Sequence, residues 1–279
     1  MSLRALRRAL AGRFAAAGIP FAQEDALELV LGLSGLDRAD LVAGAPVPEG
    51  LEARLDAAAE RRLKGEPVDR ILGHRDFYGR RFAIDGVLSP RGDTEVLLLA
   101  ALEAMRKVTA PRLLELGTGS GALAVSLLAE RPDARVTATD ISEAALQTAA
   151  RNAAAHGVEG RLTLVRSDWF EGVEGVFDAV LSNPPYIDDA AMAALPPEVA
   201  RFDPHRALRG GPDGLDTYRA IVPGARALLA PGGWLGVEIG FDQGERWQDC
   251  SGTPTSATFA SVPIRRGSLA SWRGGCSRG

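Results

Sequence analysis

The 279-residue chain is long enough for one large domain or two moderate ones, each with a hydrophobic core. Its apolar fraction of 46% and charged fraction of 24% are those of an ordinary soluble globular protein, and its net charge of −4 argues against a protein whose main task is to grip a nucleic-acid backbone. No membrane-length apolar run or signal-peptide pattern is visible, so we expect a cytoplasmic protein. The three histidines lie far apart and both cysteines fall near the C-terminus, so no metal site or disulfide framework is expected.

Residues 1–66 are expected to form a small helical domain. Leu3, Leu6, Leu10 and Phe14 recur at helical spacing, and further helical patterns cover residues 24–33, 36–42 and 51–64. Residues 1–64 carry nine basic and nine acidic side chains, so we interpret the arginines there as a solvated face. A module that docks a partner is the sharper alternative, and the sequence leaves both open.

Residues 67–90 are expected to form a hairpin linker. Glu66-Pro67 ends the helical pattern, and the stretches 70–74 and 77–84 suggest two short strands. His74 is interpreted as structural rather than catalytic. A helix that runs to about Val108 should follow, with Asp93 or Thr94 as its cap.

The segment 91–249 is expected to be an α/β domain, because strand and helix patterns alternate along it from residue 112. This alternation predicts a mostly parallel sheet. A long polar loop is expected between the fourth strand and the last helix, and such loops are usually functional or mobile. We expect strands at 112–116, 136–139, 162–165, 176–181 and 234–239, the loop at 187–215 and a helix at 216–229.

A glycine-rich turn follows the first of these strands, within the segment from Glu115 to Gly121. Its three alternate glycines let a ligand approach the backbone closely, and the next helix N-terminus adds free N–H groups. A tight strand–helix connection is the plain alternative. The second strand ends about 20 residues later in Asp140, where a carboxylate can bind the two hydroxyls of a ribose. This pairing favours the binding interpretation.

The segment Asn183-Pro184-Pro185-Tyr186, called the ledge below, follows the fourth strand. Two prolines fix φ and lack N–H groups, and a residue before proline is extended, so this backbone is stiff. A planar amino group could donate one proton to the Asn183 side-chain oxygen and the other to the Pro184 carbonyl, while Tyr186 packs against its plane. The ledge therefore suits the positioning of a weak nitrogen nucleophile, although Asn-Pro also occurs in ordinary turns.

The ledge and the glycine turn should converge on one crevice, because both lie at the carboxyl ends of parallel strands, the edge where open α/β sheets bind ligands. The glycine spacing resembles that of class I methyltransferases, which use S-adenosylmethionine. The combination of Gly117–Gly121, Ser182–Ile187 and Gly210–Leu215, within matching pieces from residue 70 to residue 240, resembles the protein-(glutamine-N5) methyltransferases of peptide chain release factors, the PrmC/HemK family.

This resemblance implies a Rossmann-like class I methyltransferase domain with seven strands, a helical substrate-recognition domain and a hairpin linker. It also implies that the enzyme transfers a methyl group from S-adenosylmethionine to the side-chain amide nitrogen of the glutamine in the Gly-Gly-Gln motif of release factors. One departure is Gly92, which stands where relatives usually have proline; it loosens the helix entry but removes no ligand group. No membrane, metal or direct nucleic-acid contact is expected, and the protein is expected to be a monomer.

The resemblance also assigns site residues. Asp168 lies where methyltransferases hold the adenine amine and Trp169 where a side chain flanks the ring, with core packing as the alternative for Trp169. Asn183, Pro184 and Tyr186 are the expected catalytic residues, and these three with Pro185 are expected to bind the substrate. The expected cofactor-binding residues are Glu115, Gly117, Thr118, Gly119, Ser120, Gly121, Asp140, Asp168, Trp169 and Asn183.

Two other functions share these motifs. A nucleic-acid amino methyltransferase would flip adenine or cytosine onto the same ledge, but it would need a basic face, and the balanced charge of the N-terminal region does not supply one. A non-catalytic module that binds S-adenosylmethionine would not need the ledge beside every cofactor residue.

Residues 250–279 are atypical. They contain no Asp or Glu, whereas the preceding residues carry all 36, and they show no helical or strand period of useful length. Back-translation from Trp247 with GC-rich codons, followed by a shift of two nucleotides, gives A-G-L-F-R-D-A-D-F-R-D-V-R-V-R-T-D-P-A-G-L-A-R-V-V-A-G. That sequence reads as a helix end and two strands around a turn, where a methyltransferase sheet needs its last helix and hairpin.

We predict that the chain after about Gln248 is the product of a reading-frame change. Resequencing the gene around the Trp247 codon should reveal the shift. An unambiguous frame that runs to a stop after Gly279, together with an intact mass that matches the printed sequence, would show that the tail is genuine.

Overall fold

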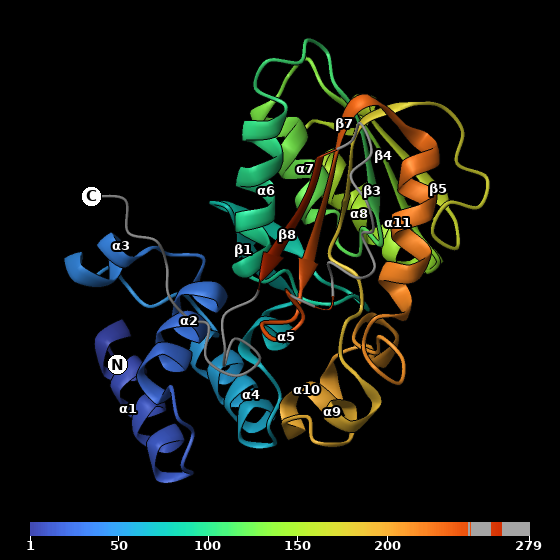
Figure 1. Ribbon diagram of the computed structural model, residues 1–279. Helices are drawn as coiled ribbons and strands as arrows, with labels where there is room; N and C mark the ends of the chain where they lie inside the picture. Colours follow the sequence, from blue (N-terminus) through green and yellow to red (C-terminus); the bar gives the residue numbers. More distant parts are fainter. Residues whose placement is uncertain (245, 247–257, 264–279) are drawn as a thin grey trace. The chain divides into compact units, whose positions relative to one another are not determined.

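The computed structural model describes residues 1–244, 246 and 258–263 (Figure 1). These residues divide into two compact units, one over Met1–His74 and one that starts at Arg75. No helix in this described part of the chain is both long enough and apolar enough to cross a membrane.

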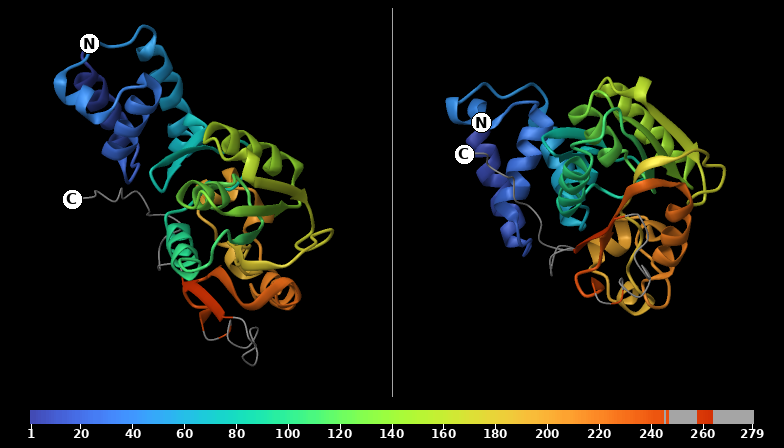
Figure 2. Two further views of the ribbon diagram at one scale, coloured as in Figure 1. Left: turned by 90° about the horizontal axis from the view of Figure 1, so that it is seen from above. Right: turned by 45° about the horizontal axis from the view of Figure 1, so that its top comes forward.

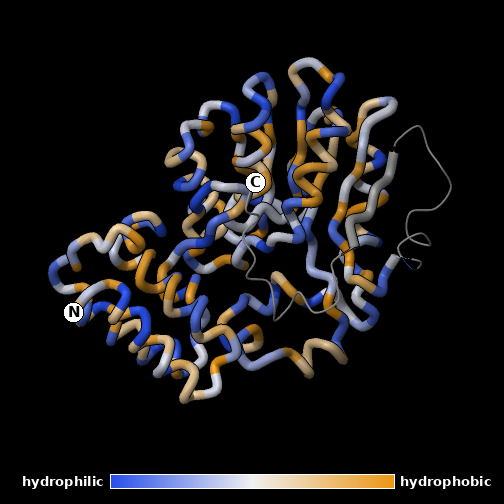
Figure 3. The backbone as a smooth tube through the Cα atoms, turned by 90° about the vertical axis from the view of Figure 1, so that its left-hand side faces the viewer, coloured by the Kyte–Doolittle hydropathy of each residue, from blue (hydrophilic) through white to orange (hydrophobic). Residues whose placement is uncertain are grey.

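The N-terminal unit is helical, as predicted. Its apolar positions meet in one core that includes Leu3, Leu6, Leu10 and Phe14, all buried. Blue hydrophilic and orange hydrophobic residues alternate along these helices in Figure 3. The helices are α1 (Leu3–Ala16), α2 (Ala22–Ser34), α3 (Arg38–Ala43), α4 (Leu51–Leu63) and α5 (Val68–Leu72).

One arginine of this unit departs from the expected solvated face. Arg62 is only 4% exposed, and its Nε donates to Oδ2 of the fully buried Asp25 at 2.6 Å. Because two charges taken out of water are costly unless paired, this contact must be kept for the core to close. Arg13, which pairs with Asp56 and Glu60 at the surface, fits the expectation.

The predicted bounds of the hairpin linker are partly wrong. Residues 70–72 belong to helix α5, because Val68 and Ile71 are buried in the helical core and Gly73 ends the helix in a left-handed conformation. The helical unit therefore continues past residue 66. The hairpin is made instead by β1 (His74–Phe77) and β2 (Arg80–Ala83), which pair in a separate two-stranded sheet.

The second unit is built on a six-stranded sheet of order β5-β4-β3-β6-β7-β8, in which every neighbouring pair is parallel. The five strands of this sheet that come first in the chain follow the predicted alternation. They are β3 (Arg112–Leu116), β4 (Arg135–Asp140), β5 (Leu162–Arg166), β6 (Phe177–Ser182) and β7 (Leu229–Ile239).

The sixth strand of this sheet, β8 (Thr258–Pro263), lies in the segment 250–279, where the sequence shows no strand period of useful length. It pairs with β7 and extends the sheet at that edge. The resemblance implied seven strands, and the described residues supply six. The rest of the atypical tail lies outside the described residues.

Helices cover both faces of this sheet (Figures 1 and 2). Successive strand side chains alternate between the faces. Leu113 packs in the core with residues of α6 (Asp93–Ala104), α7 (Ala122–Glu130) and α8 (Glu143–Ala155), while Leu114 packs in a second core with α11 (Asp216–Leu228). Odd and even positions of β3 thus serve two different cores.

Two local expectations are also corrected. Neither Asp93 nor Thr94 caps α6, whose N-cap is Gly92; both side chains are buried within the first turn. The segment 187–215 is not an uninterrupted loop. It contains α9 (Asp189–Ala193), α10 (Pro197–Phe202) and the 3-10 turn η2 (His205–Ala207), and a similar turn, η1 (Glu159–Arg161), precedes β5.

Candidate active site

The candidate site lies along the carboxyl edge of the sheet. Strand pairing aligns Leu116 with Thr139, Leu116 with Ser182, and Ser182 with Val237. The residues that follow these four stand in a row at that edge, because the strands are parallel. That row is Gly117, Asp140, Asn183 and Glu238, so the structure brings the glycine turn, the acidic residue and the ledge together as predicted.

The glycine turn is open on one side. Gly117, Gly119 and Gly121 have φ values of 70°, 54° and 76°, which favour glycine. The Thr118 N–H donates to the Thr139 carbonyl at 2.9 Å and so fixes the turn to β4. A Cβ placed on Gly117 or Gly119 would meet no other atom within 4 Å among the described residues. The turn can therefore receive a ligand against its backbone.

Asp140 faces this turn. Its Oδ2 accepts the Gly119 N–H and its Oδ1 accepts the Ser142 N–H, each at 2.9 Å. The side chain is half-buried, and each carboxylate oxygen keeps a second lone pair. Asp140 is thus held in place while it can still accept hydroxyl groups from a ribose.

Glu115 is turned into the protein. Its buried Oε2 accepts the Thr118 hydroxyl at 2.7 Å and the Ala124 N–H at 3.2 Å, so it joins the glycine turn to the first turn of α7. Burial raises the pKa of this carboxyl to about 8, against the opposing effect of the two hydrogen bonds. Ser120 is also buried, and its carbonyl accepts Nδ2 of Asn152 at 2.8 Å.

Trp169 and Asp168 follow β5 at the same edge. Trp169 has φ of 53°, which is rare for a large side chain. Its carbonyl accepts the hydroxyls of Thr139 at 3.3 Å and Ser167 at 3.0 Å. The Trp169 ring is half-buried against the core on the α11 face, while Asp168 is exposed. Core packing, the alternative interpretation of Trp169, thus accounts for the buried part of this side chain.

The second half of the ledge is fixed through its backbone. The Pro185 carbonyl accepts the Thr217 hydroxyl at 2.8 Å, and the Tyr186 carbonyl accepts Nε2 of Gln243 at 2.9 Å. Burial, and then the charge of Glu238, raise the pKa of the Tyr186 phenol above its ordinary value. The phenol therefore stays neutral, and its ring can pack against a planar group of the substrate.

The first half of the ledge keeps two acceptors. Nδ2 of Asn183 donates to the Thr94 hydroxyl at 3.0 Å. Within the described part of the chain, neither Oδ1 of Asn183 nor the Pro184 carbonyl accepts a hydrogen bond. These are the two groups that the sequence predicts as acceptors for an amino group.

Gln243 is a residue that the sequence analysis missed. This buried side chain also donates to the Gly214 carbonyl at 3.2 Å, and its Oε1 accepts the Gly240 N–H at 2.9 Å and the Tyr218 hydroxyl at 3.2 Å. A Cβ on Gly214 would lie 2.5 Å from the Tyr186 carbonyl oxygen, so the loop needs glycine there to approach the ledge. No local pattern around Gln243 indicates this role.

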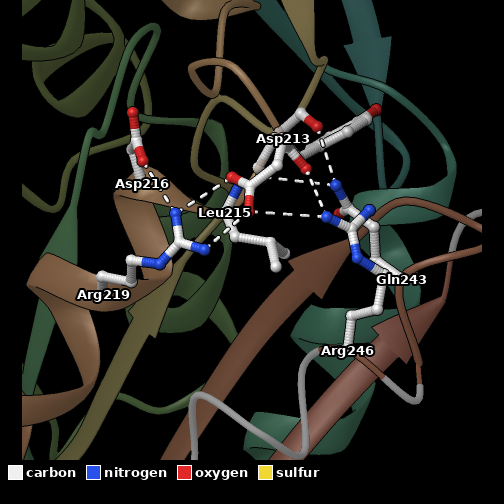
Figure 4. Close-up of polar contacts among 8 residues, drawn as sticks. Asp213, Leu215, Asp216, Arg219, Gln243 and Arg246 are labelled. Atoms are coloured by element: carbon white, nitrogen blue, oxygen red, sulfur yellow. Dashed lines mark hydrogen bonds and ion pairs between the residues drawn. The ribbon is translucent and has the colours of Figure 1, made fainter.

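An ion-pair cluster holds the same loop (Figure 4). Asp213 accepts two hydrogen bonds from the Arg219 guanidinium, at 2.6 and 2.9 Å, and Arg246 donates to the Asp213 carbonyl at 3.0 Å. The hydrogen bond from Arg219 lowers the pKa of Asp213 to about 2. The loop 210–215 is thereby fixed at the Tyr186 end of the ledge.

Glu238 is the second missed residue. It is fully buried at the end of β7, and its Oε2 accepts the Thr94 hydroxyl at 2.7 Å. Burial raises its pKa to about 7, partly offset by that hydrogen bond. A lone carboxyl within the apolar run Leu235–Ile239 is the signal that could have identified it, since such groups often mark functional sites.

Two family models and several known proteins match this chain. The family model "Methyltransferase small domain" matches residues 92–196, and "PrmC N-terminal domain" matches residues 5–73. A release factor glutamine methyltransferase from Cereibacter sphaeroides is 50% identical over 261 residues, which are 92% of this chain and 91% of that protein. One from Agrobacterium fabrum is 47% identical over 238 residues, 83% of this chain and 82% of that protein. A solved ribosomal protein L11 methylase from Lactobacillus delbrueckii gives a TM-score of 0.42 at 20% identity, covering 57% of this chain and 67% of that one.

A parallel sheet with helices on both faces, a glycine turn after β3 and an acidic residue at the end of β4 define a class I methyltransferase domain. Within that class, the chain belongs to the release factor glutamine methyltransferase family.

Glu115 should make stability depend on pH. Its folded pKa is raised from 4.5 to about 8, so the stability associated with the neutral carboxyl is complete below pH 4.5 and is lost as pH rises through about 8. The free energy of unfolding of the wild type relative to Glu115→Gln should therefore fall by a few kcal/mol over this range. Urea unfolding of both cofactor-free proteins, followed by tryptophan fluorescence, measures this difference. The exposed Glu159→Gln variant is the control, and a difference that does not vary with pH would contradict the prediction.

Proposed function

We infer that this chain transfers a methyl group from S-adenosylmethionine to N5 of the glutamine in the Gly-Gly-Gln motif of peptide chain release factors. The family membership supports the activity, and the observation that carries the reaction type is the ledge. Asn183 Oδ1 and the Pro184 carbonyl are two acceptors without partners among the described residues, next to backbone held by Thr217 and Gln243. A planar amide –NH2 group has the two donors that match them.

The residues at the sheet edge fit S-adenosylmethionine, because the open face of the glycine turn would otherwise have nothing against it. We assign Asp140 to the ribose hydroxyls, the turn from Gly117 to Gly121 to the backbone approach, and Asp168 and Trp169 to the adenine. Glu115 would act from behind the turn, by holding it to α7. The cofactor supplies an electrophilic methyl group on a sulfonium.

The ledge acts through geometry. An amide nitrogen is a weak nucleophile because its lone pair is delocalised into the carbonyl, and its conjugate acid is strongly acidic, so a base before transfer gains little. Asn183 and Pro184 accept the two N–H groups, and Tyr186 packs against the amide plane, so the nitrogen is held for in-line attack. Asn183, Pro184 and Tyr186 would hold this nitrogen in line with the methyl group that bound S-adenosylmethionine would supply, and the sulfur would be the leaving group and keep the bonding electrons. The extra proton on nitrogen is then lost to solvent or a carbonyl.

We also propose the roles that go beyond the ledge. The helical unit, extended from residue 66 to His74, would recognise the release factor, with β1 and β2 as the hairpin linker and the methyltransferase domain after it. The enzyme would act as a cytoplasmic monomer that makes no direct contact with nucleic acid. No observation on the described residues favours a nucleic-acid base as the acceptor.

A purified release factor incubated with this protein and labelled S-adenosylmethionine should gain one methyl group on the peptide that contains Gly-Gly-Gln, detected by tandem mass spectrometry. Duplex DNA is the matched alternative substrate. An unmodified peptide beside methylated DNA would overturn the assignment.

Asp140→Ala and Asn183→Ala should fail in different ways. Loss of the hydrogen bonds to the ribose should cost roughly 1.5–3 kcal/mol, about a tenfold to hundredfold loss of cofactor affinity in calorimetry. Loss of the Asn183 amide should instead lower turnover on the order of a hundredfold, because a misplaced nitrogen reacts poorly, while cofactor affinity changes little. Wild-type turnover in Asn183→Ala, or unchanged affinity in Asp140→Ala, would contradict the corresponding role.

A further inference from the structure

Three side chains that are far apart in the sequence are joined by a continuous series of hydrogen bonds at the ledge. Thr94 comes from the first turn of α6, Asn183 follows β6, and Glu238 lies at the end of β7. Asn183 and Glu238 stand at neighbouring positions of parallel strands, because Ser182 pairs with Val237. Their side chains therefore point to the same face of the sheet, the one that α6 covers.

When Glu238 is ionised, it is fixed which group donates and which accepts in each hydrogen bond of this series. A carboxylate only accepts, so the Thr94 hydroxyl must donate its single hydrogen to Glu238 Oε2, at 2.7 Å. Towards Asn183 the same hydroxyl can then only accept, and it accepts from Nδ2 at 3.0 Å.

This direction decides which end of the Asn183 amide faces the substrate. The oxygen and nitrogen of an amide have nearly the same shape, so packing alone does not distinguish the two orientations. With Nδ2 held by Thr94, Oδ1 is the end left to accept a hydrogen bond. In the flipped orientation the Asn183 –NH2 group would face the substrate –NH2 group, and two donors cannot bond to each other.

We propose that Thr94 and Glu238 are positioning residues that hold the Asn183 amide with its oxygen towards the acceptor glutamine. The proposal rests on the proposed function. It also explains why a fully buried carboxyl is kept in an otherwise apolar strand, where it is costly.

Protonation of Glu238 would relax this control. A neutral carboxyl can donate to Thr94, whose hydroxyl can then donate to Asn183 and favour the flipped amide. Besides burial and Thr94, the groups that act on Glu238 are Asp93, which raises its pKa, and Arg91 and Asn183, which lower it; the neutral Tyr186 phenol also lies nearby. The resulting pKa of about 7 means that turnover should fall as pH drops below that value.

The test compares Thr94→Val, which removes the hydroxyl and keeps the shape, with Thr94→Ser, which keeps the hydroxyl. Turnover of Thr94→Val should fall about tenfold to a hundredfold, because the amide loses its orientation, with cofactor affinity within about twofold of the wild type. Thr94→Ser should restore most of the turnover.

The decline of turnover below pH 7 should be absent in Thr94→Val and in Glu238→Gln and present in Thr94→Ser. Thr148→Val, which removes a buried hydroxyl bonded to the Asp85 carbonyl, is the control for loss of a buried hydrogen bond.

A second measurement does not need turnover. In ¹⁵N-labelled protein at pH 8.5, the side-chain –NH2 signals of Asn183, assigned by their loss in Asn183→Ala, should show nuclear Overhauser contacts to the Thr94 side chain. Absence of these contacts, or Thr94→Val with wild-type turnover and pH profile, would overturn the proposal. If the contacts are present but the wild type methylates no release factor, the orientation stands and the proposed function fails.

Discussion

The site depends on one constraint: the two acceptors of the ledge must stay without internal partners while the backbone around them is held still. Two prolines remove the N–H groups that could otherwise have bonded nearby carbonyls. Thr217 and Gln243 then bind the next two carbonyls, so Asn183 and Pro184 remain the open pair. Stiffness at the ledge thus comes from covalent chemistry first and from side chains on α11 and beyond β7 second.

The parallel sheet makes this arrangement possible. In parallel pairing, strand ends from separate parts of the chain reach the same edge, and register places Gly117, Asp140, Asn183 and Glu238 next to one another. Two of the residues at this edge, Glu115 and Glu238, are carboxyls buried on the same side as α6 and α7. Glu115 holds the glycine turn and Glu238 acts on the Asn183 side chain through Thr94, and both of these would face ligand. Burial of these two carboxyls lowers the stability of the unit close to the residues that carry out the reaction.

Much of the fold could be predicted because its elements are long and periodic. The leucines of α1 mark one buried face, the strands β3 and β6 are largely apolar, and β4 alternates apolar residues with threonine. The glycine turn, Asp140 and the ledge are local motifs, so their residues can be found without knowing what packs on them. The short helices α5, α9 and α10 were missed because one or two turns do not establish a period.

The contacts that support the ledge could not be predicted in the same way. Thr94 and Glu238 are 144 positions apart, and Gln243 is 57 positions from Tyr186. Such pairs depend on strand order and register, which a local pattern does not contain. The sequence predicts Asp93 or Thr94 as a helix cap, a role defined by neighbouring residues, whereas the Thr94 hydroxyl donates to Glu238 at the far end of the domain.

The saturated amide of Gln243 has a consequence for chemical ageing. Both of its donors bind carbonyl oxygens and its oxygen accepts two further hydrogen bonds, so every group of this side chain is used. Deamidation would turn Gln243 into glutamate and set a carboxylate oxygen against the carbonyls of Tyr186 and Gly214. Two acceptors would then face each other in a buried place. Loss of a single amide group, with no change in size, would therefore release the ledge from its loop.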